Sequence, residues 1–107
     1  MEPKAIVSTR ADDPDFDERI DRFVVRLGER IDAFQDAEAA GDPELLRGLA
    51  EALAEESAAL GYPMLAAAAR ELASACAERD RAALRKRVVD LTELSQRVRR
   101  GHRSAAG

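Results

Sequence analysis

Three carboxylates stand close together near the middle of the chain, in the stretch LAEALAEESAALGYP at residues 49–63. Glu51, Glu55 and Glu56 fall on an expected helix, and four-helix proteins can bind metal ions through such carboxylates. Those sites also need Glu-x-x-His motifs, and none of the three glutamates has a histidine three residues later. The sequence therefore predicts no metal site, and a solvated helix face is the simplest interpretation of these charges.

The chain has one cysteine and one histidine, the other side chains that could take part in chemistry. Cys76 is the only cysteine, so an intrachain disulfide is excluded, and its place on an apolar helix face predicts a buried thiol. His102 is the only histidine and has no acid nearby in the sequence to orient it, so an exposed, non-catalytic side chain is expected. No phosphate-binding loop, Cys/His metal spacing or nucleophilic triad is present. We therefore predict neither an enzyme activity nor a cofactor.

The composition is that of a soluble globular protein and argues against nucleic acid as a partner. Hydrophobic residues make up 46% of the 107 residues and charged residues 36%, with a net charge of −4. The charge is uneven, since six of the ten residues 12–21 are acidic and four of the seven residues 97–103 are arginines. A negative balance disfavours nucleic acid, and the short basic end is interpreted as a solvated terminus.

A membrane partner is not expected either. No apolar run approaches the roughly 20 residues that a membrane-spanning helix needs. Met1-Glu2-Pro3-Lys4 is followed by only three apolar residues, which predicts no signal peptide. The expected location is the cytoplasm.

Glycine and proline divide the chain into segments. Residues 1–13 are expected to form an N-terminal arm, in which AIVST could lie against the rest of the protein. Asp13-Pro14 and Asp42-Pro43 each read as a cap followed by the first helical residue. Turns are expected near Gly41, Gly61 and Arg79, and residues 101–107 after the last helix are expected to be a disordered basic tail. The expected helices span residues 14–40, 43–60, 63 to the turn at 78–80, and 81–100.

Apolar residues recur at spacings of three and four in each segment, and no segment alternates for long enough to make a strand. Four helices joined by short turns must run antiparallel. The sequence therefore predicts an all-α, antiparallel up-down four-helix bundle at residues 14–100, as a monomer or weak homodimer. The expected core residues are Ile20, Phe23, Val24, Leu27, Ile31, Phe34, Leu46, Leu49, Leu53, Leu60, Leu65, Ala68, Ala69, Leu72, Cys76, Leu84, Val88, Leu91 and Val98.

The pattern resembles the histidine-containing phosphotransfer (HPt) domain of bacterial phosphorelays. That family carries a signature on its second long helix, roughly L-A-H-x-L-K-G, followed by small residues and a glycine-containing turn. Leu49-Ala50, Leu53 and the segment Ser57 to Pro63 fit this signature in register. FVVRLGERI, AAGDPELL and LAAAARELASACAERDRAAL are similar to the surrounding helices, so the resemblance covers about residues 14–100. It implies a signalling role and a docking face on the second helix.

The chain departs from that signature at the three positions that take part in phosphoryl transfer. Glu51 stands at the position of the phosphoacceptor histidine, Ala54 at that of the lysine, and Glu55 at that of the glycine. Phosphoryl transfer needs the imidazole as nucleophile and a positive charge beside the moving oxygens. Glu55 adds bulk and a second negative charge one turn from Glu51, where like charges repel. With Glu56, the surface is expected to be acidic and to suit the acidic pocket of a receiver domain poorly.

The resemblance thus predicts a pseudo-HPt domain that binds a receiver or histidine-kinase domain without carrying phosphate. Its partner-binding surface would comprise Glu51, Ala54, Glu55, Glu56 and Ala58. Two alternatives stay open. One is an authentic phosphorelay protein with an unusual acceptor, and the other is a helical scaffold that self-associates and has no link to phosphorelays.

Overall fold

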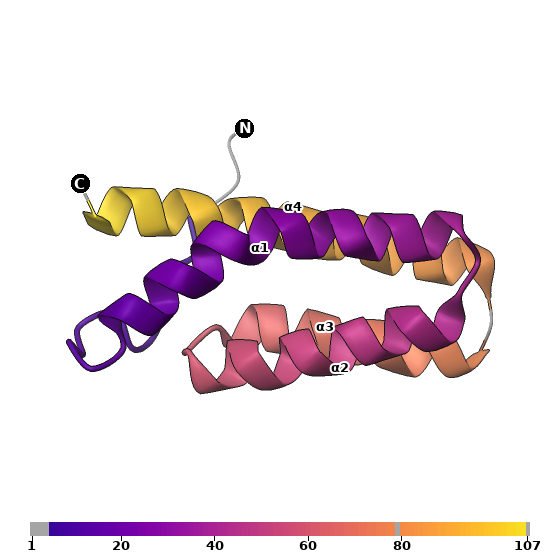
Figure 1. Ribbon diagram of the computed structural model, residues 1–107, viewed down its shortest axis with the longest axis horizontal. Coiled ribbons are helices and arrows are strands. Elements are labelled where there is room, and N and C mark those ends of the chain that lie inside the picture. Colours follow the sequence, from indigo (N-terminus) through magenta and orange to yellow (C-terminus); the bar gives the residue numbers. More distant parts are fainter. Residues whose placement is uncertain (1–4, 79, 107) are drawn as a thin grey trace.

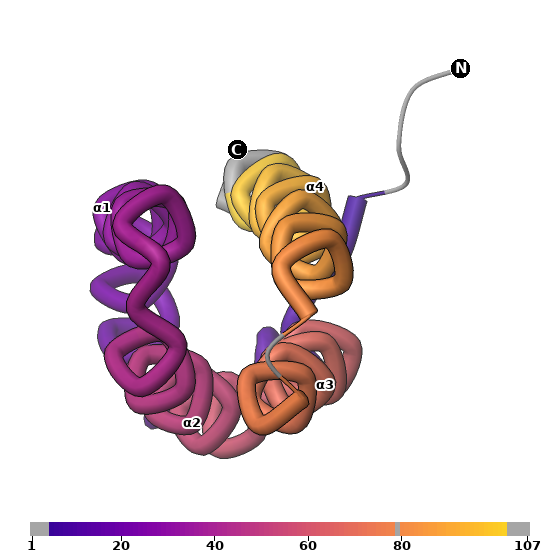
Figure 2. Tube along the Cα trace, turned by 90° about the vertical axis from the view of Figure 1, so that its right-hand side faces the viewer, coloured from indigo at the N-terminus to yellow at the C-terminus, as the bar shows by residue number. Residues whose placement is uncertain are grey.

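The chain folds as the expected antiparallel up-down four-helix bundle. The structure is a computed structural model that describes residues 5–78 and 80–106, with side chains described as far as residue 102. The helices are α1 (Asp17–Ala39), α2 (Pro43–Ala59), α3 (Pro63–Glu78) and α4 (Arg81–Ala106). Each runs opposite to the one before it (Figure 1). Seen end-on, they follow one another around a ring, with α2 diagonally opposite α4 (Figure 2). The described residues contain no strand.

Two of the helix starts follow from local side chains. The Asp42 carboxylate accepts a hydrogen bond from the Leu45 backbone N–H at 3.0 Å, and Pro43 occupies the first helical position, as predicted. The Asp80 carboxylate accepts bonds from the first turn of α4 in the same way. The middle of the expected third turn, Arg79, lies outside the described residues.

The start of α1 differs from the prediction. The Asp13 carboxylate accepts a hydrogen bond from the Asp15 backbone N–H at 3.0 Å, so it closes a tight turn and does not cap the helix. Pro14, Asp15 and Phe16 are turn residues, and α1 begins at Asp17 with Phe16 as an N-cap that makes no side-chain bond. The first part of the acidic stretch, residues 12–16, therefore precedes the helix, and the rest of it forms the start of α1.

The core matches the apolar pattern with two adjustments. Leu49 and Ala68 are only half-buried, while Ala50 and Ala66 are fully buried between helices. Tyr62 is the larger surprise, because it belongs to a turn in the sequence yet is only 1% exposed. Its ring stacks on Phe23 with centroids 5.7 Å apart, so the α2–α3 turn is anchored in the core from within.

The described part of the arm crosses one end of the bundle. The Ile6 N–H donates to the Arg97 carbonyl at 3.0 Å, and the Thr9 N–H donates to the Gly61 carbonyl at 2.8 Å. The arm thereby joins α4 to the α2–α3 turn, as the sequence allowed.

The predicted helix end at Gly101 is wrong. α4 continues through Gly101 to Ala106, into the segment expected to be a disordered tail. A Cβ built at Gly101 would lie 1.9 Å from the Ile6 carbonyl oxygen. Gly101 therefore does not end the helix. Its lack of a side chain allows the arm to pack closely against α4.

Candidate functional site

The three positions at which the chain departs from the phosphotransfer signature line a shallow hollow between α2 and α3. Successive helical residues are about 100° apart, so positions 51, 54, 55 and 58 share one side of α2. Glu51, Glu55 and Ala58 are exposed on that side. The hollow measures ≈ 540 Å³, and its lining comprises Glu51, Ala54, Glu55, Arg70, Ala73 and Ser74.

Ala54, at the centre of this side, is buried. Its side chain is 5% exposed because α2 and α3 approach closely through small residues such as Ala50, Ala66 and Ala69, which are also buried. Position 54 is not among the core residues that the apolar spacing predicts. The structure places it at the seam between the two helices, so a longer side chain there would have to extend along the hollow to reach solvent.

The charges of the hollow are more balanced than expected. The Glu51 carboxylate lies 3.6 Å from the Arg47 guanidinium one turn earlier. Arg70 of α3 lines the hollow together with Glu55, and neither forms an ion pair among the described residues. The hollow thus presents two carboxylates with two arginines close by.

Glu56 does not belong to this side. It follows Glu51 by five residues, which turns it by about 140° around the helix. It forms an ion pair with Arg30 of α1 and lines the groove between α1 and α2. The predicted five-residue surface is therefore divided: Glu51, Ala54 and Glu55 line the α2–α3 hollow, Ala58 is exposed on the same side of α2, and Glu56 faces the other way.

Cys76 is buried, as predicted, and is 4% exposed. Burial, with a smaller contribution from the Glu51 carboxylate, raises the pKa of its thiol, while Arg47 acts in the opposite direction. A thiol with a raised pKa is a poor nucleophile at neutral pH.

His102 is less isolated than predicted. Its side chain is 23% exposed, and its Nε2 lies 3.0 Å from the Asp21 carboxylate on α1. The acid is 81 residues away in the sequence, so the local sequence around His102 does not reveal it. The signal that could have found it is the antiparallel pairing of α1 and α4, which brings the start of α1 beside the end of α4.

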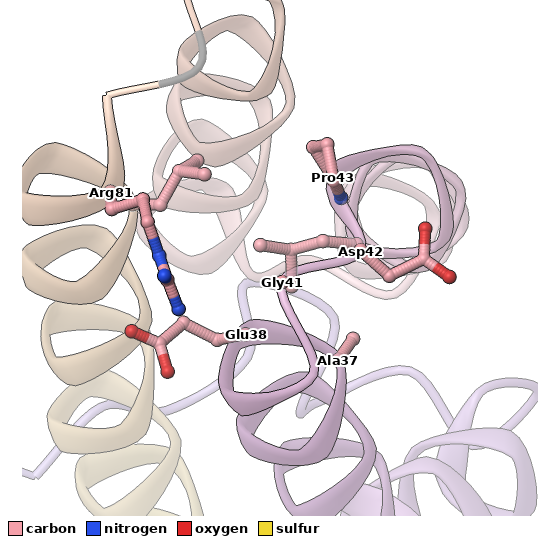
Figure 3. A pocket seen from close by; sticks show the side chains of 8 residues that line it. Ala37, Glu38, Gly41, Asp42, Pro43 and Arg81 are labelled. Carbon is pink, nitrogen blue, oxygen red and sulfur yellow. The ribbon is translucent and has the colours of Figure 1, made fainter.

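A second hollow of ≈ 290 Å³ lies at one end of the bundle, where the α1–α2 turn meets the start of α4. Figure 3 shows the Arg81 side chain extending toward the Glu38 carboxylate across its mouth. Asp42 also lines it, but its carboxylate already caps α2. The charged side chains that line this hollow are thus already engaged, Arg81 with its approach to Glu38 and Asp42 with the start of α2.

Neither a metal cluster nor a membrane span is found in the described part of the chain. No three His, Cys, Asp or Glu side chains within it gather closely enough to hold a metal ion. None of its helices combines the length and the apolar character that crossing a bilayer requires.

Comparisons with known proteins add no further assignment. No protein-family model matches the chain, and neither curated proteins nor solved structures gave a match. The resemblance to phosphotransfer domains therefore stays a prediction from the residues quoted above.

Proposed function

We propose that this chain is a cytoplasmic signalling module of a phosphorelay, which binds a receiver or histidine-kinase domain through the α2–α3 hollow without carrying phosphate. The observation that supports it is the joint substitution of the signature positions on one side of α2. Glu51, Ala54 and Glu55 replace the nucleophile, the cation and the small residue together, within a four-helix bundle whose frame residues are kept.

The chemistry of the hollow favours binding over group transfer. Glu51 is exposed and its carboxylate has one nearby cation, Arg47, at 3.6 Å. An acyl phosphate formed there would be open to water, and position 54, where the signature has a lysine, would supply no positive charge to the moving oxygens. Ala54 is buried and uncharged. A module of this kind competes with a true carrier domain or holds its partner in place.

The binding test uses the exposed Ala58, on the same side of α2 as Glu51. A panel of receiver and kinase domains is titrated into the isotope-labelled chain, and shifted amide signals are mapped by NMR. Ala58→Tyr should weaken binding at least tenfold by steric block, about the loss that 1.4 kcal/mol produces. Gln96→Tyr, on the exposed side of α4 diagonally opposite α2, should leave it unchanged. Absence of binding across the panel would refute the proposal.

The transfer test asks whether phosphate can be accepted. With phosphorylated receivers, or with a kinase and ATP, neither Glu51 nor His102 should acquire stable label; stoichiometric label at either would favour the unusual-acceptor alternative. Glu51→His alone should stay inert, whereas the triple variant Glu51→His, Ala54→Lys, Glu55→Gly should accept phosphate weakly from a receiver that binds.

Because Ala54 is buried, the stability of the triple variant must be measured alongside its activity. Lysine there should lower the free energy of unfolding by about 1–3 kcal/mol, since extra atoms must fit at the seam between α2 and α3. Ala52→Lys, at an exposed position of the same helix, should have little effect. A folded triple variant that neither binds nor accepts phosphate from any receiver would instead favour a helical scaffold with no link to phosphorelays.

A further inference from the structure

A stripe of arginines lies along the side of α1 that faces α2. Arg19, Arg22, Arg26 and Arg30 recur at spacings of three, four and four residues, so they share one side of the helix. With the α2 residues Glu56 and Leu60 they line a groove of ≈ 760 Å³. We call this the arginine groove.

The guanidinium groups of the arginine groove are only partly neutralised. Arg30 pairs with Glu56 and lies over the Phe23 ring, 5.8 Å from its centroid. Arg22 pairs with Glu18 at 2.7 Å in an exposed contact, which holds such side chains weakly. Arg26 forms no ion pair among the described residues.

The arginine groove carries a charge opposite to that of the whole chain. Besides its four arginines it is lined by two carboxylates, Glu29 and Glu56, which leaves an excess of two positive charges. The chain as a whole has a net charge of −4. The groove is therefore a local site for negative charge.

The matching negative charge is on the same chain. The turn before α1 and its first helical turn carry five acidic residues, and Figure 1 shows this segment, in indigo, projecting beyond the end of α2 and α3. The acids at positions 12, 15 and 17 are exposed and form no ion pair in the part of the chain that the structure describes. We call this segment the acidic knob; it comprises Asp12, Asp13, Asp15, Asp17 and Glu18.

We propose that two copies of this chain associate through α1, with the acidic knob of each copy in the arginine groove of the other. A twofold axis across α1 sets the two helices antiparallel, which brings the start of one beside the middle of the other. The same contact then forms twice, as in an isologous dimer. Val25, an apolar side chain that is 71% exposed on the outer side of α1, would be covered by the partner helix.

The charge pattern favours a second copy over other anionic occupants. An extended polyanion such as nucleic acid or an acidic membrane surface would meet the acidic knob directly beside the arginine groove and be repelled. A second copy instead places its own knob in the groove and has its own groove filled in return. The inference does not rest on the proposed function, since the arginine groove lies off the α2–α3 hollow.

The association should be weak and sensitive to salt, because most of its contacts join exposed charges. Sedimentation equilibrium of the full chain should show a monomer–dimer equilibrium at low ionic strength that shifts toward monomer as sodium chloride rises from about 50 to about 500 mM. A mass of one chain at all concentrations would overturn the proposal.

Charge reversal provides the sharper test. The groove variant Arg22→Glu/Arg26→Glu and the knob variant Asp12→Arg/Asp15→Arg/Asp17→Arg should each dimerise at least about tenfold more weakly, since every knob then faces a groove of like charge. Mixed in equal amounts, the two variants should form a heterodimer of about wild-type affinity, because both of its contacts join opposite charges.

Matched controls separate this contact from general charge effects. Asp32→Arg/Asp36→Arg reverses two exposed acids elsewhere on α1 and should leave dimerisation unchanged, and circular dichroism should show all variants folded. Dimerisation that is indifferent to the groove and knob variants, or a mixture that stays monomeric, would overturn the proposal. So would a monomeric wild-type chain that binds anionic vesicles or duplex DNA through the arginine groove.

Discussion

The two ends of the bundle are closed in different ways. At one end, which we call the arm end, residues 6–9 cross from α4 to the α2–α3 turn and bond to the Arg97 and Gly61 carbonyls. At the other, the turn end, the α1–α2 turn at Gly41 meets the start of α4 and leaves a hollow of ≈ 290 Å³ (Figure 3). The arm end is held by an additional segment, whereas the turn end is held only by the helices it joins.

The difference between the two ends can be measured at two glycines, one in each turn. Gly41 and Gly61 both have a positive φ, 67° and 83°, at the same kind of turn. A Cβ at Gly41 would meet no atom closer than 3.9 Å, while one at Gly61 would lie 2.6 Å from Thr9 Oγ1. The turn end thus needs glycine for its backbone conformation alone, and the arm end needs it for packing as well.

The largest effect is expected from Gly101→Ala at the arm end. The new Cβ would overlap the Ile6 carbonyl oxygen, which belongs to backbone and cannot rotate away. We expect the free energy of unfolding to fall by about 2–4 kcal/mol. Chemical denaturation measures the loss, and hydrogen exchange at the Ile6 and Thr9 amides should accelerate as the arm detaches.

Gly28→Ala is the matched control within a helix. A Cβ there would come no closer than 3.5 Å to the flexible Arg99 side chain. The better helix propensity of alanine should therefore raise stability by up to about 1 kcal/mol. If Gly101→Ala proved equally stabilising, the close packing of the arm against α4 would be contradicted.

The second effect compares the two turns directly. Gly41→Ala should lower the free energy of unfolding by about 1 kcal/mol, the cost of a left-handed conformation. Gly61→Ala should cost about 2–3 kcal/mol, because the arm must also move. Equal losses at the two positions would show that the arm adds nothing to the α2–α3 turn.

Most of the fold could be predicted because it depends on local signals. The apolar spacing located the four helices, and Gly41, Asp42 and Pro43 marked one turn correctly because their roles depend on neighbours in sequence. Gly101 was misjudged for the opposite reason. A glycine late in a helix commonly ends it, and only the position of Ile6, 95 residues earlier, shows that this glycine makes room for the arm.

Less of the candidate site could be predicted, since its surroundings come from other helices. Helical geometry alone is enough to separate Glu56 from Glu51, because five residues turn the helix by about 140°. The burial of Ala54, the presence of Arg70 in the hollow and the His102–Asp21 contact each depend on which helices lie side by side. The identity of a binding partner depends on surfaces outside this chain and stays a prediction.

The third effect isolates the hydrogen bonds of one hydroxyl group in the arm. Ser8 Oγ donates to the Leu60 carbonyl in a buried contact and accepts from the Arg10 N–H. Ser8→Ala should lower the free energy of unfolding by about 1–2 kcal/mol, because it removes both bonds and leaves the Leu60 carbonyl unpaired. Ser74→Ala, at an exposed position of α3, should change it little. The result is contradicted if both variants unfold at the same denaturant concentration.

The smallest effect is a pH dependence that arises at both ends. Burial raises the pKa of the Cys76 thiol near the turn end and of the Tyr62 hydroxyl at the arm end. The unfolded chain therefore releases these protons at lower pH than the folded chain does. Their contribution to stability is complete below the unfolded thiol pKa of about 8.5 and is lost as pH rises through the folded value.

Paired variants separate the two groups. Urea unfolding between about pH 7 and pH 10 should show the wild-type chain losing more stability than Cys76→Ala, and Tyr62→Phe should differ from wild type only at the upper end of that range, because a phenol ionises later than a thiol. At about pH 8, a disulfide reagent should modify Cys76 far more slowly in the folded chain than in urea. A folded-state rate equal to the unfolded one would mean that the turn end opens readily. If Tyr62→Phe still differed from wild type only at high pH, the arm end would have stayed closed. Opening would then be confined to the turn end, which no arm covers.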